Sequence, residues 1–391
     1  MQAIAPNVKF IGAEDDNLDL FEGQYPLTKG ISYNSYLIDD EQIAVMDAVD
    51  IRRCSDWLTR LADALGGRTP AYLIVQHMEP DHSGSIRAML ERYPEAKVVA
   101  TAKAMAMLDN FFDGIDLAER RVTVADGDTL SLGRTTLRFI TAPMVHWPEV
   151  MVTLDETDGI LFSADAFGSF AMSEADEAWT DEARRYYCNI VGKYGANVQA
   201  LMKKLTGLQF STIASLHGPL LDGDLARYWT LYDKWSRYEP ECRGTLVAYA
   251  SIYGGTAEAA RRLAMELEKR DAGEVVLMDL CRHDVSYAVA EAFRLSRLAL
   301  CSVTYDASLF PAMHNFLHHL EMKNFRNRPF ALIENGSWAP VAGKLMCDTL
   351  GRMKGMTQVA PVLTIRSRMH PADLCGISAL ADALADALAK A

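Results

Sequence analysis

Short apolar runs and amphipathic segments alternate through the first part of the chain. Residues 30–49, GISYNSYLIDDEQIAVMDAV, carry two apolar stretches around the polar turn DDEQ, which predicts a β-hairpin. Residues 55–65 have helical apolar spacing, with Ser55 as the expected N-cap. The run AYLIVQ at 71–76 is typical of a short buried strand. Further strands are expected within 96–101, 121–143 and 150–167.

The pattern changes after a helix expected at 222–239 and a break at PECRG, 240–244. Five apolar runs follow, TLVAYAS, EVVLMDL, LALCSVT, PFALIEN and QVAPVLTI, and helical segments separate them. Regular strand–helix alternation predicts a parallel, doubly wound α/β domain. We therefore expect two domains, residues 1–242 and residues 243–391.

Charge and cysteine usage narrow the function classes. The 391-residue chain has a formal net charge of −13, and an acidic chain repels phosphate backbones, which argues against a nucleic-acid partner. No apolar run is long enough for a membrane span, and the N-terminal segment MQAIAPNVKF lacks the layout of a secretion signal. The seven cysteines are scattered and form no Cys-x-x-Cys pair. We expect a reduced, cytoplasmic protein without a disulfide framework.

The most concentrated chemistry lies in QHMEPDHSGS, residues 76–85. His77, Glu79, Asp81 and His82 place four possible metal ligands within six residues, directly after an expected strand. The intervening proline removes a backbone donor and fixes φ, which predicts an ordered loop rather than a helix. Such a loop can direct alternate residues toward two neighbouring points, and so toward two metals.

Three further ligand types follow strand candidates elsewhere in the first domain. They are His146 in APMVHWPEV, Asp165 in LFSADAFGS and His217 in TIASLHGPLL. The only histidines before residue 243 are His77, His82, His146 and His217. A lone histidine is more often structural, but four at strand ends favour a metal site. Four imidazoles and three carboxylates without a thiolate suit two divalent metals, with Asp165 as the natural bridge.

The second domain opens with the loop SIYGGT, between a strand and an alanine-rich helix. Hydroxyls, glycines and a helix N-terminus can hold an anion, and the absence of a P-loop lysine favours a monophosphate. Two later loops combine aromatic and small polar residues after strands, where ligands of doubly wound domains bind. The candidate cofactor-binding residues are Ser251, Ile252, Tyr253, Gly254, Gly255, Thr256, Ser302, Val303, Thr304, Tyr305, Asp306, Ala307, Asn335, Gly336, Ser337, Trp338 and Ala339.

These motifs resemble a known family. The first segment resembles the metallo-β-lactamase superfamily motif His-x-His-x-Asp-His, but with Glu79 in place of the second histidine, as in the flavodiiron proteins. ISYNSYLI, APM-HWP and HGP are also similar to that family, and SIYGGT resembles the FMN phosphate loop of flavodoxins. The resemblance implies an N-terminal metallo-β-lactamase-like αββα sandwich plus a C-terminal flavodoxin-like doubly wound parallel sheet.

The resemblance to this family also implies two non-haem irons and one FMN as cofactors. One iron would take His77, Glu79 and His146. The other would take Asp81, His82 and His217, with Asp165 between the two. In some members of the family, water displaces the histidine that corresponds to His82.

The activity implied is reduction of dioxygen to water, of nitric oxide to nitrous oxide, or of both, with no catalytic side chain beyond the metal site. The implied electron donor is a separate rubredoxin, with a reduced deazaflavin coenzyme as the alternative. A head-to-tail homodimer, or a dimer of such dimers, is expected. Basic residues in 323–328, including Arg326 and Arg328, and in 365–368 are a candidate docking surface for an acidic rubredoxin.

Two other functions stay open at this point. A zinc-dependent hydrolase of the metallo-β-lactamase fold with a flavodoxin-like accessory domain is the main alternative, against which Glu79 and the flavin loops argue. A pure electron carrier leaves the first domain unexplained. Departures from the family pattern stand at Ala164, Phe170, Leu216 and Val303, and around Gly336 and Trp338.

Overall fold

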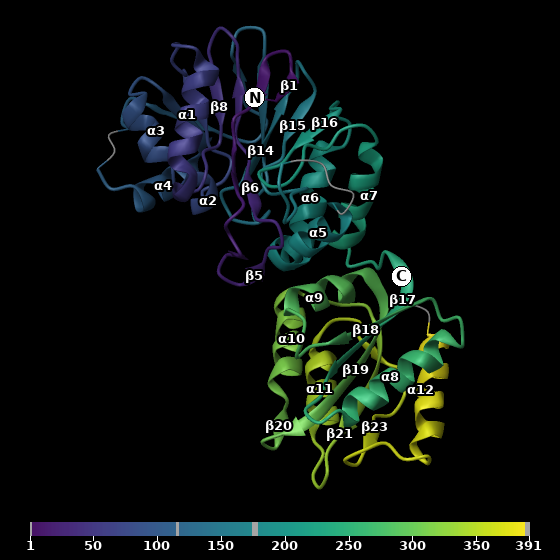
Figure 1. Ribbon diagram of the computed structural model, residues 1–391. Coiled ribbons are helices and arrows are strands. Elements are labelled where there is room, and N and C mark those ends of the chain that lie inside the picture. The colour runs from purple at the N-terminus through teal and green to yellow at the C-terminus, as the bar shows by residue number, and fades with distance from the viewer. Residues whose placement is uncertain (1, 115–116, 174–178, 388–391) are drawn as a thin grey trace. The chain divides into compact units, whose positions relative to one another are not determined.

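The computed structural model describes residues 2–114, 117–173 and 179–387. The chain forms two compact units, of which the first contains 1–187 and 196–232 and the second contains 188–195 and 233–391. Each unit has its own sheets and core (Figure 1).

Two mixed sheets form the centre of the first unit, with strand orders β1-β2-β7-β8-β9-β10-β11 and β12-β13-β14-β15-β16. The first sheet consists of β1 (Ala3–Ala5), β2 (Val8–Phe10), β7 (Tyr36–Ile38), β8 (Ala44–Met46), β9 (Tyr72–Ile74), β10 (Lys97–Thr101) and β11 (Arg121–Val124). The second consists of β12 (Thr129–Ser131), β13 (Thr136–Thr141), β14 (Met151–Asp155), β15 (Ile160–Phe162) and β16 (Thr212–Ala214). Two small antiparallel pairs join β3 (Ala13–Asp15) to β6 (Ile31–Tyr33) and β4 (Leu20–Phe21) to β5 (Tyr25–Pro26).

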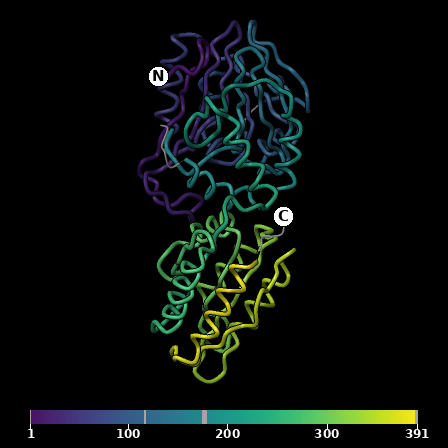
Figure 2. The backbone as a smooth tube through the Cα atoms, turned by 90° about the vertical axis from the view of Figure 1, so that its right-hand side faces the viewer, coloured from purple at the N-terminus to yellow at the C-terminus, as the bar shows by residue number. Residues whose placement is uncertain are grey.

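The two sheets share one apolar core, to which the first contributes Ile74 and Val99 and the second contributes Phe139 and Phe162. Helices lie outside the sheets, which gives the αββα order that the sequence predicted (Figures 1 and 2). They are α1 (Cys54–Leu65), α2 (Pro80–Ser83), α3 (Ile86–Arg92), α4 (Ala102–Phe111), α5 (Trp179–Tyr186), α6 (Gly195–Leu205) and α7 (Leu225–Ser236). The short turn η1 (Ile51–Arg53) also lies in this unit, whereas η3 (Gly192–Tyr194) and all but the first residue of the π-helical η2 (Tyr187–Val191) belong to the second unit.

Most local expectations for this unit were confirmed. Strands β7 and β8 pair antiparallel, which confirms the predicted hairpin, and the strands expected within 150–167 form the antiparallel pair of β14 and β15. The expected N-cap at Ser55 is wrong, because α1 already begins at Cys54. Asp50 caps the preceding turn instead, and its carboxylate accepts from the Arg52 backbone N–H at 2.8 Å.

The second unit contains a parallel sheet of order β18-β17-β19-β21, in which β22 and β23 both pair with β21. Its strands are β17 (Cys242–Ala250), β18 (Glu274–Asp279), β19 (Leu295–Tyr305), β20 (Ser308–Leu309), β21 (Pro329–Asn335), β22 (Thr357–Gln358) and β23 (Leu363–Ile365). Its helices are α8 (Gly255–Glu268), α9 (Val285–Arg294), α10 (Pro311–Met322), α11 (Ala342–Arg352) and α12 (Asp373–Asp386). Helices α8 and α12 cover one face, and α9, α10 and α11 cover the other (Figure 1).

Burial on both faces explains the continuous apolar runs in the central strands. Residues 244–250 of β17 are all buried, and only Cys242 and Arg243 at the start of the strand are partly or fully exposed. The predicted doubly wound domain is therefore confirmed. Within the described ranges, no helix is long and apolar enough to cross a membrane.

Arg328 is not the surface cation that the sequence predicted. Its side chain is buried, and its guanidinium donates to the carbonyls of Tyr238, Phe293 and Leu295 at 2.7, 2.9 and 2.9 Å. Burial lowers the pKa of Arg328 to about 10. These hydrogen bonds compensate for the hydration that the guanidinium loses on burial. Arg328 therefore links segments within the second unit, and its buried side chain cannot contact a partner protein.

We expect Arg328→Ala to lower the free energy of unfolding by about 3 kcal/mol, because it leaves buried carbonyls without donors. Urea denaturation followed by circular dichroism measures this. Arg366→Ala, an exposed arginine without an ion pair among the described residues, should change stability by less than about 0.5 kcal/mol. Equal stability of both variants would contradict a structural role for Arg328.

Candidate functional site

The predicted loop at residues 77–82 is partly helical. His77 follows the end of β9, Glu79 is the N-cap of α2, and Asp81 and His82 lie within α2. Pro80 occupies the first helical position, where a missing N–H costs nothing because no helical acceptor exists for it. The expectation that this proline excludes a helix was therefore wrong, although the segment is short and ordered.

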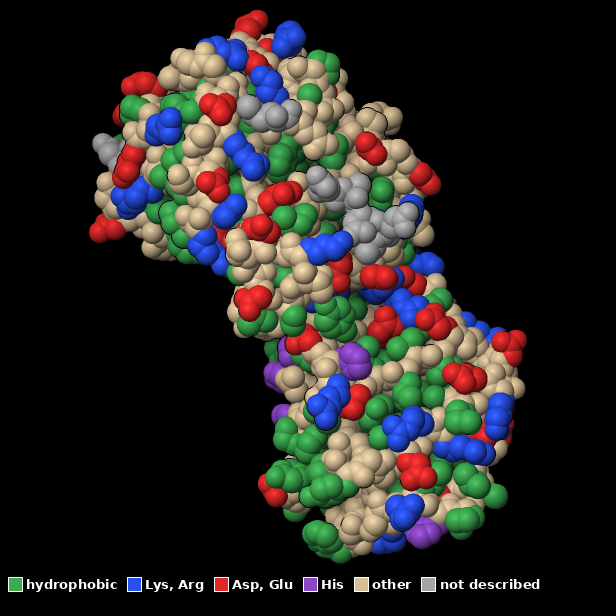
Figure 3. All heavy atoms as spheres, viewed as in Figure 1, with side chains coloured by type: hydrophobic (Ala, Val, Ile, Leu, Met, Phe, Trp, Pro, Cys, Tyr) green, Lys and Arg blue, Asp and Glu red, His purple; other side chains and the backbone are tan. Residues whose placement is uncertain are grey.

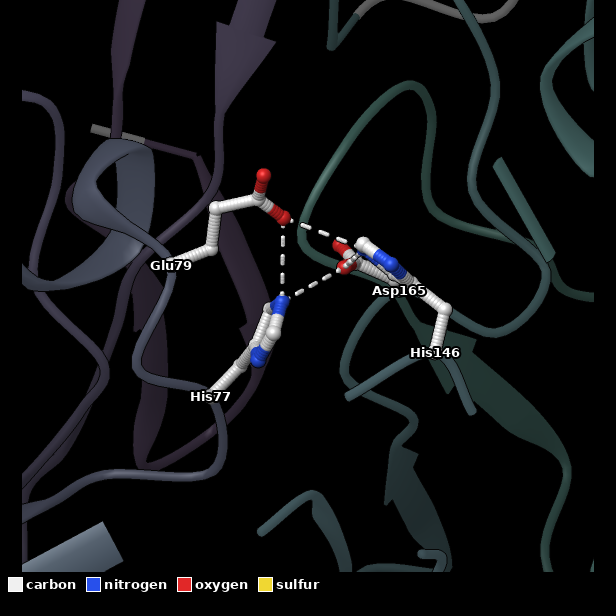
Figure 4. A group of neighbouring side chains, drawn as sticks. All are labelled: His77, Glu79, His146 and Asp165. Carbon is white, nitrogen blue, oxygen red and sulfur yellow. Dashed lines mark hydrogen bonds and ion pairs between the residues drawn. The ribbon is translucent and has the colours of Figure 1, made fainter. Parts of the chain in front are cut away.

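The first group of side chains contains His77, Glu79, His146 and Asp165 (Figure 4). The Nε2 atoms of His77 and His146 lie 3.2 and 3.1 Å from Oε2 of Glu79. The same two nitrogens lie 3.2 and 3.1 Å from Oδ2 of Asp165. Two imidazoles and two carboxylates thus converge on one point from three separate segments of the chain.

The second group contains Asp81, His82 and His217. Oδ2 of Asp81 lies 3.3 Å from His82 Nε2 and 3.1 Å from His217 Nε2, and the two nitrogens are 3.0 Å apart. Oδ1 of Asp165 lies 3.4 and 3.8 Å from these same nitrogens. Asp165 therefore presents one oxygen to each group, as a bridging carboxylate would.

The donor set fits a pair of metal ions. Both carboxylate oxygens of Asp81 and of Asp165, and Nε2 of His146, are buried without a hydrogen-bond partner among the described residues. Buried polar atoms are normally paired, and a metal ion satisfies such atoms as ligands. The set contains oxygen and nitrogen donors only, which is the chemistry of iron, manganese or zinc rather than of copper(I).

Electrostatics of the first group favour a cation at its centre. Burial opposes protonation of His77, but Asp165 and Glu149 raise its pKa well above the ordinary value. Burial likewise opposes protonation of His146, yet the neighbouring carboxylates of Asp165 and Glu79 raise its pKa to about 9. Positive charge is thus stabilised among the carboxylates, either as protons or as a metal that replaces them.

Two residues that the sequence did not single out orient the imidazoles. Glu149 is buried, and its Oε1 lies 2.8 Å from His77 Nδ1 and accepts from the Met78 N–H at 2.9 Å. Because a carboxylate only accepts, Nδ1 carries the proton and His77 Nε2 keeps its lone pair for a metal. The Ser32 carbonyl fixes His217 in the same way, 2.7 Å from its Nδ1. Ser32 and Glu149 lie within the segments ISYNSYLI and APMVHWPEV, but those patterns do not indicate which atoms meet the imidazoles.

Aromatic rings cover the second group on the side of His217. Phe21 and Tyr186 contact the His217 ring at centroid distances of 5.3 and 5.6 Å. Phe170 packs edge-on against both of these rings at 5.6 and 5.0 Å, and the Arg185 guanidinium lies 4.4 Å over Phe170. An apolar wall of this kind keeps water from one side of the metal ligands.

The predicted cofactor loops of the second unit line one cavity of about 620 Å³. Its lining residues are Ser251, Ile252, Tyr253, Gly255, Thr256, Val303, Thr304, Tyr305, Asp306, Ala307, Asn335, Gly336, Ser337, Trp338, Ala339 and Ser367. The structure thus brings together every predicted residue except Gly254 and Ser302. Ser367 was missed, because its segment carries no glycine-rich or aromatic pattern.

Close backbone contacts shape this cavity. A Cβ atom on Gly255 would lie 2.5 Å from the Ser367 carbonyl oxygen, so the loop needs glycine there. Asn335 Nδ2 donates to the same carbonyl at 3.1 Å, and Ser367 Oγ lies 2.9 Å from Ser337 Oγ. Trp338 and Tyr253 are 87% and 99% exposed, so aromatic surface is available at the rim for a planar ligand or a partner.

Comparisons with known proteins find relatives over most of the chain. A family model described as ODP family beta lactamase matches residues 31–218. The chain is 34% identical to diflavin flavoprotein A 1 of Synechocystis sp. over 291 residues, 72% of this chain and 50% of that protein. It is 29% identical to the anaerobic nitric oxide reductase flavorubredoxin of Pectobacterium carotovorum over 344 residues, 85% of this chain and 68% of that protein. The chain therefore spans half of the first relative and about two thirds of the second.

Two solved structures have the same fold over nearly the whole chain. Rubredoxin oxygen:oxidoreductase from Desulfovibrio gigas superposes with a TM-score of 0.92 at 23% identity, over 98% of this chain and 97% of that one. The flavodiiron protein from Giardia intestinalis superposes with a TM-score of 0.91 at 25% identity, over 98% and 96%.

Fold and sites together define a β-lactamase-like sandwich that carries a paired imidazole–carboxylate centre, followed in the same chain by a flavodoxin-like unit. The chain belongs to the flavodiiron protein family.

The hydrogen bond between Glu149 and His77 yields a test of the centre. We expect Glu149→Ala to weaken metal binding about tenfold or more, because His77 loses the acceptor that fixes its tautomer. Glu149→Gln, which keeps an acceptor oxygen, should lie between this variant and the wild type. Metal retained after equilibration with a graded chelator measures the effect.

Glu156→Ala is the matched control, because Glu156 makes only an exposed ion pair with Arg138. Metal retention that is the same in the Glu149 and Glu156 variants would show that Glu149 does not orient a ligand.

Proposed function

We propose that the protein reduces dioxygen to water, nitric oxide to nitrous oxide, or both, at a non-haem di-iron centre that receives electrons from FMN. The observation that carries this proposal is the convergence of seven nitrogen and oxygen donors on two adjacent points, with Asp165 facing both. The Desulfovibrio gigas relative is named for rubredoxin and oxygen, and the Pectobacterium relative for nitric oxide.

In this assignment, His77, Glu79 and His146 would hold one iron and Asp81, His82 and His217 the other, with Asp165 between them. Two ferrous ions and a reduced flavin would supply four electrons, the number needed to reduce dioxygen to water. The protein contributes the orientation of the imidazoles through Glu149 and Ser32, and the exclusion of water by the aromatic wall. No side chain acts as a nucleophile.

Glu79 favours iron over the zinc of the alternative hydrolase. A carboxylate in place of an imidazole makes the site harder and more anionic, which stabilises a ferric ion. A zinc hydrolase also has no use for a second cavity lined by hydroxyls and aromatic rings. Residues 1–242 are accordingly proposed as the di-iron domain and 243–391 as the FMN domain, with the FMN phosphate at residues 251–256.

The proposed electron donor is a separate rubredoxin, with a reduced deazaflavin coenzyme as the alternative. Arg366 and Arg368 are exposed and flank Ser367, which lines the flavin cavity. They support docking of an acidic donor at 365–368. Arg328 is buried, so it is not part of the docking surface proposed at 323–328.

A head-to-tail homodimer, alone or paired into a tetramer, is the proposed assembly. Tyr253 and Trp338 expose aromatic surface at the flavin rim, and Leu20 and Ile51 expose apolar surface on segments that contact the metal-bearing elements. Exposed apolar patches of this kind mark protein interfaces. Flavin in one copy would then serve the metal centre of the other.

Metal selection by Glu79 can be tested directly. We expect the wild-type protein to be purified with iron and flavin, with the visible absorbance of both. Glu79→His should shift the bound metal toward zinc, because it restores an imidazole-rich set. Elemental analysis after growth in medium that contains both metals measures this.

A colourless wild-type protein with zinc alone would refute the di-iron proposal. Stopped-flow mixing of the fully reduced wild-type protein with dioxygen and with nitric oxide then ranks the two substrates. Failure of both gases to reoxidise it would refute the proposed reductase activity.

Transfer between subunits can be tested by complementation. His146→Ala removes one metal ligand, and Ser251→Asp places a negative charge in the proposed phosphate loop. Each variant alone should be inactive. A 1:1 mixture of the two chains should recover up to about a quarter of wild-type activity, because half of the dimers are mixed and each mixed dimer carries one intact flavin–metal pair instead of two.

Refolding or coexpression of the two variants, with flavin and iron content checked, provides the sample. Activity that stays at the level of the single variants in verified mixed dimers would show that electrons pass within one chain.

A further inference from the structure

A second cavity, of about 470 Å³, lies beside the flavin cavity and shares Ser251 and Ile252 with it. The residues that line it are Tyr249, Ser251, Ile252, Gly254, Ala257, Arg261, Asp279, Cys281 and Arg282. They come from the ends of β17 and β18 and from the start of α8. The proposed di-iron and FMN chemistry makes no use of it.

The cavity lies at the carboxyl ends of β17 and β18, and this position indicates a class of ligand. Strand β18 pairs in parallel with β17, and Tyr249 is opposite Asp279 at their carboxyl ends. In the dinucleotide-binding branch of the doubly wound folds, a carboxylate at the end of the second strand hydrogen-bonds the hydroxyls of an adenosine ribose, or a nearby arginine accommodates a ribose phosphate in their place. Asp279 ends β18, and Arg282 follows within the same cavity.

The charges of the cavity suit a phosphorylated ligand. Arg261 and Arg282 are exposed, and neither guanidinium forms an ion pair or hydrogen bond with any part of the chain that the structure describes. By contrast, the neighbouring Arg262 pairs with Glu266 at 3.1 Å. Figure 3 shows acidic and basic side chains interspersed over the visible face. Two uncompensated guanidinium groups at one cavity form a local anion site on an acidic protein.

Asp279 narrows the choice of ligand. Its carboxylate repels a bare inorganic anion but accepts hydrogen bonds from hydroxyl groups, and its Oδ1 already accepts from the Cys281 N–H at 2.9 Å. A ligand that carries hydroxyls beside phosphates satisfies both the carboxylate and the arginines. The cavity is also polar, which excludes a purely apolar ligand.

We propose that this cavity binds a phosphorylated adenosine, with the ribose hydroxyls at Asp279 and phosphate oxygens at Arg261 and Arg282. Such a group can come from a free adenine nucleotide or from the adenylate half of a flavin dinucleotide whose isoalloxazine occupies the neighbouring cavity. The proposal concerns binding alone, so it does not depend on the metal centre or on reductase activity.

The test is calorimetric titration of the FMN-loaded protein with adenosine 5′-diphosphate (ADP) and with pyrophosphate at low salt. We expect ADP to bind at least about tenfold more tightly than pyrophosphate, because only the nucleotide offers ribose hydroxyls to Asp279. Arg261→Gln and Arg282→Gln should each weaken ADP binding about tenfold, through loss of a charge-assisted hydrogen bond. Arg262→Gln, one residue away on the same helix, should leave the affinity unchanged.

Absence of binding, equal affinity for pyrophosphate, equal loss in the Arg262 variant, or release of FMN by ADP would each overturn the proposal. Loading the apoprotein with FMN or with FAD identifies the source of the adenylate group. Tighter binding of FAD than of FMN, with loss of the ADP site, would assign the cavity to the cofactor. Equal binding of the two flavins would assign it to a free nucleotide.

Discussion

The structure of the metal centre depends on the buried carboxylate of Asp165. One of its oxygens faces the imidazoles of His77 and His146, and the other faces those of His82 and His217. Burial raises the cost of its negative charge, yet the surrounding histidines hold its pKa well below the ordinary value. The group is therefore stable only with positive charge on both sides, and that constraint joins two ligand groups into one centre.

This constraint explains why the ligands lie at the ends of strands. His77 follows β9, Asp165 follows β15 and His217 follows β16, so closing the sandwich brings these ends together. The second unit uses the same principle, because the carboxyl ends of its parallel strands meet at one edge and carry the flavin loops. In both units a rigid sheet positions irregular segments that bear the chemistry.

The structure shows what surrounds four of the residues that depart from the family pattern. Ala164 adopts a φ of +50° next to Asp165, a conformation that asparagine tolerates better than alanine, and its carbonyl accepts from the Leu216 N–H at 2.9 Å. Phe170 belongs to the aromatic wall beneath Arg185. Val303 lines the flavin cavity. All four side chains lie outside the ligand set, so these positions can alter the surroundings of each cofactor without removing a ligand.

Residue pattern alone determined the order of elements, the two-domain organisation and the residues that could bear chemistry. The spacing of apolar residues indicates which positions of a local segment are buried. Four histidines at strand ends favour a metal site over separate structural roles. Tertiary structure decided which atoms meet. Glu149, Ser32 and Ser367 lie in segments that the sequence marked, but their contacts at the sites could not be predicted from it. Pro80 begins a helix where the sequence predicted a loop, and Arg328 is buried although it lies in a basic run. These outcomes depend on contacts between residues far apart in the chain, which no local pattern encodes.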